Sequence, residues 1–305
     1  MLRYLVRRVV LSVAVLLGLS MLVFAMVNLS GDPVRLLLPP DASAADVARF
    51  RTAMGLDDPL PVRYVRFLAK AVRLDFGDSI QLRDPALELV LQRLPATLTL
   101  AGLAVAAAIV IGVPLGVLTA VRRDTAWDTV ITALALVGQS TPVFWVGVMS
   151  ILLFAVRLRW LPSSGTGGPE HLVLPVGTLT LFLLGGLVRV TRTSMLEVLD
   201  RAYVRTATAK GQRRRIVVWR HAFRNALVPV VTQIGLQMRF VIGGSVITET
   251  IFAWPGLGRL LVNAVYARDY PVVEAGVFVV ASILIVVNTL VDLSYARLNP
   301  KVSLA

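Results

Sequence analysis

Tyr203-Val-Arg-Thr-Ala-Thr-Ala-Lys-Gly211 stands at the centre of a charged segment, residues 189–229, that separates two long apolar segments. Ten Lys and Arg residues lie at positions 189–225, against only two acidic residues. The small side chains at positions 206–209 permit close approach of another surface, and Gly211 can adopt the left-handed conformation that ends a helix. The stretch therefore predicts a helix, a glycine break and a second short helix at a membrane surface.

The composition indicates a membrane protein. Of the 305 residues, 56% are hydrophobic and only 16% are charged, whereas a soluble domain is less apolar and more charged. The formal net charge is +13, and the basic residues lie between apolar segments. That placement favours contact with lipid headgroups and the cytoplasm over nucleic-acid binding. Cysteine is absent, which excludes disulfides and thiolate metal sites.

Six apolar segments are each long enough to cross a bilayer, which takes about 20 residues. The first follows Arg7 and Arg8 and is too long for a cleavable signal peptide. The interruptions are mostly Gly, Pro, Ser and Thr, which membrane helices tolerate. We therefore expect one all-α polytopic membrane domain over residues 1–305. The expected spans are residues 9–29, 96–121, 129–156, 172–196, 226–250 and 272–295.

The distribution of positive charge predicts the orientation. Six spans place both termini on one side of the membrane, together with seventeen Lys and Arg residues, whereas the two short opposite loops carry four. Both termini are therefore expected in the cytoplasm. The remaining loop, residues 30–94, has nine basic and nine acidic residues, and long loops translocate largely regardless of charge.

The 30–94 loop carries helix signals. Ser43 with Asp46 predicts an N-terminal cap before a helix at 47–54, which Gly55 can end. Residues 60–74 carry a helical apolar stripe, at Val62, Val65, Leu68, Ala69 and Val72. Asp84-Pro85 predicts the start of a further helix that runs to Arg93.

Several motifs, in order along the chain, resemble a known family. They are Gly55-Leu-Asp-Asp-Pro-Leu-Pro61, Asp75-Phe-Gly-Asp-Ser79, Ser140-Thr-Pro-Val-Phe-Trp145, Gly243-Gly-Ser-Val-Ile-Thr-Glu249, Ala253-Trp-Pro-Gly-Leu-Gly258 and Asp269-Tyr-Pro271. With the loop around Gly211, they resemble the B-type permease subunits of dipeptide, oligopeptide and nickel importers of the ATP-binding cassette (ABC) class. The resemblance covers nearly the whole chain and implies a type I ABC importer permease fold.

In that family, a cytoplasmic loop inserts a coupling helix into a groove of an ATPase subunit. The resemblance implies this role for residues 189–225, with Gly211 as the family's glycine and Ala207 as its small residue. Arg205 replaces the glutamate that names the loop, and Arg224 replaces a proline. The alternative is a basic loop that only fixes topology. The implied coupling residues are Arg205, Thr206, Ala207, Thr208, Ala209, Lys210 and Gly211.

The resemblance also implies partners. These are a homologous second permease subunit in a heterodimer, two ABC ATPase domains, an extracytoplasmic solute-binding protein and lipid of a bacterial cytoplasmic membrane. The 30–94 loop is then either a docking platform for the binding protein or a passive shield. Peptides are the expected cargo, with nickel chelates, glutathione or haem as alternatives. A self-sufficient secondary transporter and a membrane scaffold are the alternatives outside the family.

The sequence contains no motif for nucleotide binding or catalysis in this chain. No lysine follows a glycine, so a Walker A nucleotide site is absent, and ATP and magnesium are expected in the partner ATPase. No catalytic, cofactor or metal motif appears either, and the chain is not expected to be an enzyme.

Polar residues inside the spans are candidates for the translocation path. The candidates are Gln139, Ser140, Thr141, Gln233, Gln237 and Arg239. For the glutamines, hydrogen bonding to a neighbouring helix is an equal alternative. Pro142 predicts a kink or freed carbonyls at a cavity. Three acidic residues, Glu249, Glu274 and Asp292, are expected near span ends, where solvation is easy.

Overall fold

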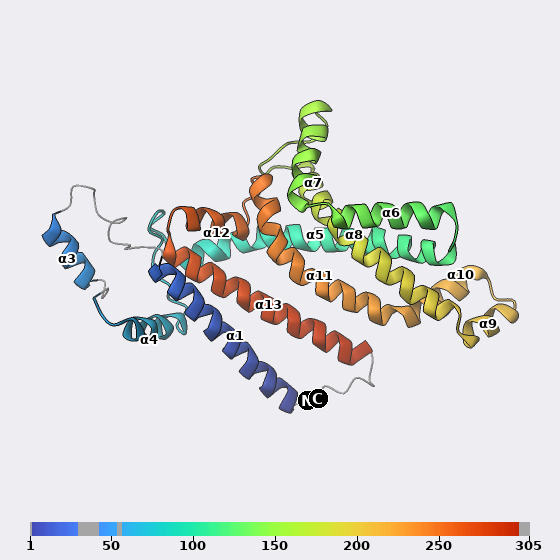
Figure 1. Cartoon of the computed structure of the whole chain (residues 1–305), viewed down its shortest axis with the longest axis horizontal. Helices are drawn as coiled ribbons and strands as arrows, with labels where there is room; N and C mark the ends of the chain where they lie inside the picture. Colours follow the sequence, from blue (N-terminus) through green and yellow to red (C-terminus); the bar gives the residue numbers. More distant parts are fainter. Residues whose placement is uncertain (1, 30–42, 54–56, 299–305) are drawn as a thin grey trace. The chain divides into compact units, whose positions relative to one another are not determined.

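The structure, a computed structural model, describes residues 2–29, 43–53 and 57–298. Within these ranges every named element is helical, which confirms the expected all-α class. The helices are labelled in Figure 1. The chain divides into two compact units. The first comprises Met1–Leu94 and Leu260–Ile285, and the second comprises Pro95–Arg259 and Val286–Ala305.

The first unit contains the N-terminal helix and most of the predicted 30–94 loop. Its elements are α1 (Leu2–Leu29), α3 (Ala44–Ala53), α4 (Leu60–Ala71), the start of α5 (Ala86–Val121), most of α12 (Leu257–Tyr266) and the first part of α13 (Tyr270–Leu298).

The cap predicted for the first loop helix is confirmed. Ser43 Oγ accepts a 3.2 Å hydrogen bond from the Asp46 backbone N–H and donates one of 2.6 Å to the Asp46 carboxylate. The helix begins at Ala44, earlier than predicted, because the capped turn precedes the apolar residues. Gly55, the predicted end of this helix, lies outside the described residues.

The helix predicted at 60–74 is also present, as α4, but its apolar stripe is not the packed face. The face of Tyr64 and Phe67 packs on α1, where both rings lie within 6 Å of the Phe24 ring. The Tyr64 hydroxyl also lies 3.0 Å from Ser20 Oγ. Val62, Val65 and Val72 of the stripe remain exposed.

The last loop helix does not end at Arg93 as predicted. It begins at Ala86 and continues without a break as α5 to Val121, with Pro95 inside it. Proline removes only one backbone donor, and a membrane helix accommodates that loss. The alanine and leucine residues on both sides favour helix.

Two sequence motifs of the first unit meet although they are separated by 190 residues. The buried carboxylate of Asp269 accepts hydrogen bonds from Ser79 Oγ and, at 3.0 Å, from the Ile80 backbone N–H. Ser79 Oγ in turn accepts from the Leu82 N–H at 2.9 Å. The carboxylate therefore fixes the end of the 30–94 loop to the start of α13.

The second unit is built around one buried helix, α8. Its elements are the rest of α5, α6 (Ala126–Ser140), α7 (Val143–Ser150), the π-helix η1 (Ile151–Arg157), α8 (Glu170–Leu199), α9 (Ala202–Ala209), α10 (Arg214–Ile216), the π-helix η2 (Val217–Phe223), α11 (Arg224–Ile251) and the end of α13. Helix α8 packs on α5, α6 and α11.

Glycines allow this close packing. A Cβ atom at Gly116 of α5 would lie 2.5 Å from the Thr191 Cβ atom of α8. At Gly185 of α8 it would collide with the Ala135 carbonyl oxygen of α6. Small residues at helix contacts let membrane helices approach in this way.

The six predicted spans each coincide with a helix or a bent pair of helices, but not all are long, straight and apolar. Helices α5, α8 and the Tyr270–Leu293 part of α13 are long and apolar enough to cross a membrane. Counting two bent pairs as one span each raises the number to five. In α1 the apolar helix Val10–Met26 is shorter, so the number six stays a prediction.

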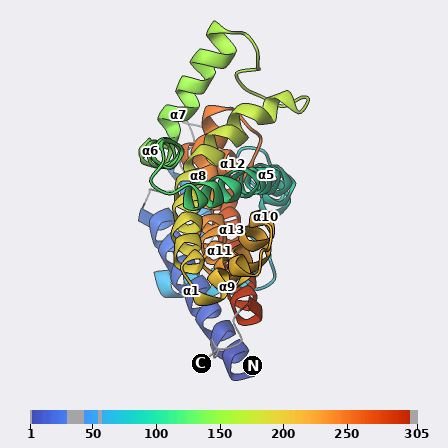
Figure 2. The same cartoon turned by 90° about the vertical axis from the view of Figure 1, so that its right-hand side faces the viewer.

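The span predicted at residues 129–156 is present as a bent pair of helices, with a full break at the predicted interruption, Pro142. Helix α6 ends at Ser140, and α7 begins at Val143 after a bend of 102° (Figure 2). Thr141 and Pro142 have extended backbone, with ψ of 131° and 132°. Proline disfavours the helical conformation in the residue before it, which explains the break at Thr141.

Candidate functional site

The predicted coupling turn has the expected helix–glycine–helix form. It lies at the C-terminal end of α8, where α9 ends at Ala209 and Gly211 adopts a φ of +75° (Figures 1 and 2). The Gly211 N–H donates to the Thr208 carbonyl at 3.0 Å, and the Gln212 N–H donates to the Ala207 carbonyl at 3.4 Å. This is a Schellman C-cap, which satisfies the last carbonyls of the helix.

The two sides of α9 have different surroundings. Val204 and Ala207 are buried with Val217 of η2, so the small Ala207 side chain packs within the chain. The other predicted coupling residues are exposed: Arg205, Thr206, Thr208, Ala209, Lys210 and Gly211. Tyr203, omitted from the predicted set, is also exposed and shares the outer face with Thr206 and Lys210 at helical spacing.

A cavity of about 430 Å³ lies beside the coupling turn. Residues from α5, α8, α9 and η2 line it, including Val121, Leu199, Val204 and Val217. Arg214 crosses its rim, where Nη2 donates a 3.2 Å hydrogen bond to the Val121 carbonyl. The turn is therefore held by a small apolar cluster and by the hydrogen bond of Arg214, and a cavity lies beside it in place of packed side chains.

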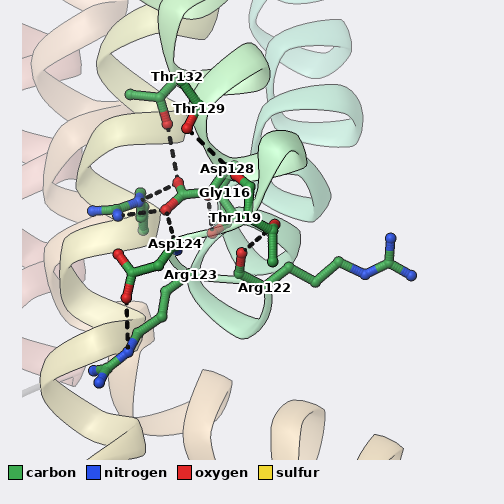
Figure 3. A network of polar contacts seen from close by, with 10 residues as sticks. Gly116, Thr119, Arg122, Arg123, Asp124, Asp128, Thr129 and Thr132 are labelled. Carbon is green, nitrogen blue, oxygen red and sulfur yellow. Dashed lines mark hydrogen bonds and ion pairs between the residues drawn. The ribbon is translucent and has the colours of Figure 1, made fainter.

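An ion pair joins α6 to α8 two turns before α8 ends. Arg192 Nε and Nη2 donate to the two oxygens of Asp128, each at 2.7 Å. The Asp124 N–H and Thr132 Oγ1 complete the shell of the carboxylate, at 3.1 and 3.3 Å (Figure 3). This pair was not predictable from the sequence, because Asp128 stands 64 residues from Arg192 and neither belongs to a recognised motif.

Three predicted path residues converge on a pair of glycines in α8. A Cβ atom at Gly186 would lie 2.7 Å from Gln233 Nε2, 2.9 Å from Gln237 Nε2 and 3.7 Å from Gln139 Nε2. Gln237 is 8% exposed and donates a 2.7 Å hydrogen bond to the Leu183 carbonyl. For Gln237 this is the helix-to-helix bond that was the alternative to a path lining.

The other three predicted path residues lie apart from this cluster. Ser140 is exposed at the end of α6, and Thr141 Oγ1 donates to the Val137 carbonyl of its own helix at 2.7 Å. Arg239 lines a separate cavity of about 250 Å³, whose lining includes none of the glutamines.

Glu249 is not solvated as predicted but fully buried, with 0% of its surface exposed. Its Oε1 accepts a 2.6 Å hydrogen bond from Thr97 Oγ1, and its Oε2 accepts one of 3.0 Å from the Arg259 backbone N–H. Thr97 Oγ1 itself accepts from the Leu257 N–H at 2.8 Å. The carboxylate thus accepts a backbone N–H of the first turn of α12. Negative charge is favourable there because the N-terminal end of a helix is partially positive.

Two side-chain hydrogen bonds hold the corner of residues 253–258, which follows Glu249. Ala253 has a φ of 51°, which is unusual for a residue with a side chain, and its carbonyl accepts a 2.6 Å bond from Arg259 Nη1. Trp254 Nε1 donates to the Ala96 carbonyl of α5 at 3.0 Å.

Among the described residues, no group of three His, Asp or Glu side chains is placed to hold a metal ion.

Two family models match the chain, one in its N-terminal third and one in the remainder. Residues 112–304 match the family "Binding-protein-dependent transport system inner membrane component", and residues 1–101 match the N-terminal region of such components. The oligopeptide transport system permease protein of Bacillus subtilis is 40% identical over 98% of both chains. The dipeptide transport system permease protein of Alkalihalophilus pseudofirmus is 36% identical over 99% of both chains.

Solved structures share the fold at lower identity. A chain of the MetNI methionine ABC transporter in an inward-facing conformation aligns with a TM-score of 0.59 and 20% identity, covering 69% of this chain and 96% of that chain. A chain of an amino acid ABC transporter aligns with a TM-score of 0.53 and 17% identity, covering 69% and 94%. From the family match and the full-length relatives, the chain belongs to the family of inner membrane components of binding-protein-dependent transport systems.

Proposed function

We propose that this chain is one permease subunit of an ATP-driven importer of di- or oligopeptides. The observation that carries the proposal is the match, along nearly the whole length of both chains, to permeases named for oligopeptide and dipeptide transport. The chain forms half of the translocation pathway, and the second half comes from a homologous permease in a heterodimer. Hydrolysis of ATP, with its magnesium, takes place in two partner ATPase domains.

The coupling turn is the contact with the ATPase. Its exposed face offers Tyr203, Thr206 and Lys210, while Val204 and Ala207 hold the helix on the permease. A docking helix needs this division, because force from the partner reaches the chain only through the buried side. The Arg205 side chain, in place of the family's glutamate, gives the contact a positive charge.

The proposal fixes an orientation. Both termini and the coupling turn face the cytoplasm of a bacterial cell, six segments cross the cytoplasmic membrane, and the 30–94 loop faces outward. There the loop receives an extracytoplasmic solute-binding protein. The excess of basic residues in the cytoplasmic loops supports this orientation. The translocation path runs past Gln139, Ser140, Thr141, Gln233, Gln237 and Arg239.

Reconstitution tests this function. The chain is co-expressed with the genes of its importer, purified as a complex and placed in vesicles with ATP inside. Uptake of labelled di- and tripeptides that requires the binding protein and stops when the ATPase is inactivated would support the proposal. Uptake that survives the inactive ATPase and stops with a proton uncoupler would refute it. Competition by nickel chelates, glutathione or haem distinguishes the alternative cargoes.

A further inference from the structure

Arg239 is a charged side chain of α11 for which the described residues offer no acid. Its Nε atom is buried and has no hydrogen-bond acceptor. Asp128, by contrast, is saturated by Arg192, and Glu249 by Thr97 and a backbone N–H. A guanidinium inside an apolar segment is costly unless it meets an anion, a carbonyl or water, so an acceptor from outside the described chain is required.

The cavity beside Arg239 is otherwise apolar. It has a volume of about 250 Å³, and its walls come from Leu179 and Phe182 of α8, Val143 of α7 and Phe240 of α11. A space of this size can hold one apolar side chain. The guanidinium at its wall can bind one anion. The ligand that matches both features is a carboxylate attached to an apolar group.

A helix break and a helix bend meet at this cavity. Val143 is the first residue of α7, directly after the 102° bend at Thr141 and Pro142. Gly243 and Gly244 follow the 51° bend of α11 and also line the cavity. Discontinuous helices surround substrate sites in membrane transporters because their ends expose backbone polar groups. The cavity therefore combines a guanidinium whose buried Nε lacks an acceptor, an apolar wall and, beside Val143, an interrupted helix.

We propose that Arg239 binds the C-terminal carboxylate of a peptide in transit, with the peptide's last apolar side chain in the cavity. The planar guanidinium offers two parallel N–H donors to a carboxylate, which a lysine does not. The inference rests on the proposed function, since it requires peptide as cargo. It assigns to Arg239 the recognition of the free C-terminus, and it separates Arg239 from the glutamine cluster over Gly186.

The test compares two cargoes in the reconstituted complex, a tripeptide ending in Phe with a free carboxylate and the same peptide amidated at its C-terminus. Uptake of each is measured for the wild-type complex, for Arg239→Met and for Arg239→Lys. The free-acid to amide ratio of the uptake rates should fall about tenfold in Arg239→Met, since a charge-assisted pair contributes on that order. Arg239→Lys should retain part of the preference.

The matched control is Arg224→Met, on the same helix but exposed at its cytoplasmic end. It should leave the ratio unchanged. A second measurement uses the same tripeptide with a photoreactive phenylalanine at its C-terminus. Cross-links should form in α8 and α11 in the wild type, and they should be lost in Arg239→Met.

An unchanged ratio in Arg239→Met, or cross-links that avoid α8 and α11, would overturn the inference while leaving peptide import standing. Equal loss of both cargoes, or a complex that fails to assemble, would also overturn it and leave Arg239 as a partner of the second permease. Failure of the wild type to take up any peptide would remove the proposed function and this inference together.

Discussion

Arg192 and Asp128 form a two-point ion pair, with both nitrogen–oxygen distances at 2.7 Å. The pair links the first turn of α6 to α8, two turns before α8 ends at Leu199. Asp128 is only 8% exposed and Arg192 is 28% exposed, so the pair is partly shielded from water. Removal of one partner should therefore cost more than at a surface pair, because the remaining charge is shielded from water and unpaired.

The first prediction concerns this ion pair. Asp128→Asn should lower the free energy of unfolding in mixed detergent micelles by about 1–3 kcal/mol, because it leaves the Arg192 guanidinium partly buried without an anion. Arg192→Met should cost a similar amount. The double variant should cost less than the sum of the two, since each side chain acts mainly through the other.

The matched control for this cycle is Arg123 with Asp200. Their nearest atoms are 3.9 Å apart, and both side chains are more than half exposed. Arg123→Met should therefore have no measurable effect on the free energy of unfolding. Additive losses in the Asp128 and Arg192 cycle would show that the two side chains act independently.

The second prediction concerns the buried carboxylate of Glu249. Glu249→Gln puts an amide group where Thr97 Oγ1 and the Arg259 N–H donate, one to each carboxylate oxygen. One donor must then lose its acceptor, and the complex should lose about 1–3 kcal/mol of stability. Gly256→Ala should have a comparable effect, because its Cβ atom would collide with the Glu249 carboxyl carbon.

Gly243→Ala is the control for the glycine substitution, since a Cβ atom there meets nothing within 4 Å. Thermal unfolding of the purified complex measures all three variants. If Glu249→Gln unfolds at the wild-type temperature, the carboxylate does not hold the 253–258 corner.

Local patterns in the sequence predicted the features that depend on neighbouring residues. The cap at Ser43 and the left-handed Gly211 are both present, because each is decided within a few residues. For Glu249, its position along the helix led to a wrong prediction of its exposure to water. Its place near the end of a span suggested water, but Thr97, 152 residues earlier in the chain, covers it.

The partners of Asp128 and Asp269 were likewise not predictable. Each of these carboxylates meets its partner only after distant helices pack, and nothing in the local pattern of either segment indicates it. Pro142 is an intermediate case. The residue indicated an interruption, but a kink and a full break produce the same local signal, and only the packing of α6 and α7 decides between them.

The third prediction concerns the outer loop. Replacing α3, Ala44–Ala53, by a Gly-Ser linker of equal length should leave the membrane helices inserted. It keeps the bonds of Tyr64 to α1 and of Ser79 to Asp269, which a larger deletion would remove. Stimulation of ATP hydrolysis by the binding protein in vesicles should fall, because the described side chains of α3 are largely exposed and available for docking. Full stimulation would make α3 a passive shield.

The last prediction concerns Gly211, whose φ of +75° ends α9. A Cβ atom there would meet nothing within 4 Å, so the effect of a substitution is conformational rather than steric with neighbours. Gly211→Val places a β-branched residue at positive φ, at a cost of about 1–3 kcal/mol. The turn should therefore change its path, and the complex should insert normally but lose ATPase association or transport.

Two further variants separate the turn from the residue type. Gly211→Asn should retain most of the activity, because asparagine tolerates the left-handed conformation. Gly102→Val places valine at a helical glycine that likewise has no neighbour within 4 Å, so it should leave ATPase association unchanged. Co-purification of the ATPase and peptide uptake measure both effects. A Gly211→Val complex that assembles and transports like the wild type would exclude this turn as the coupling element.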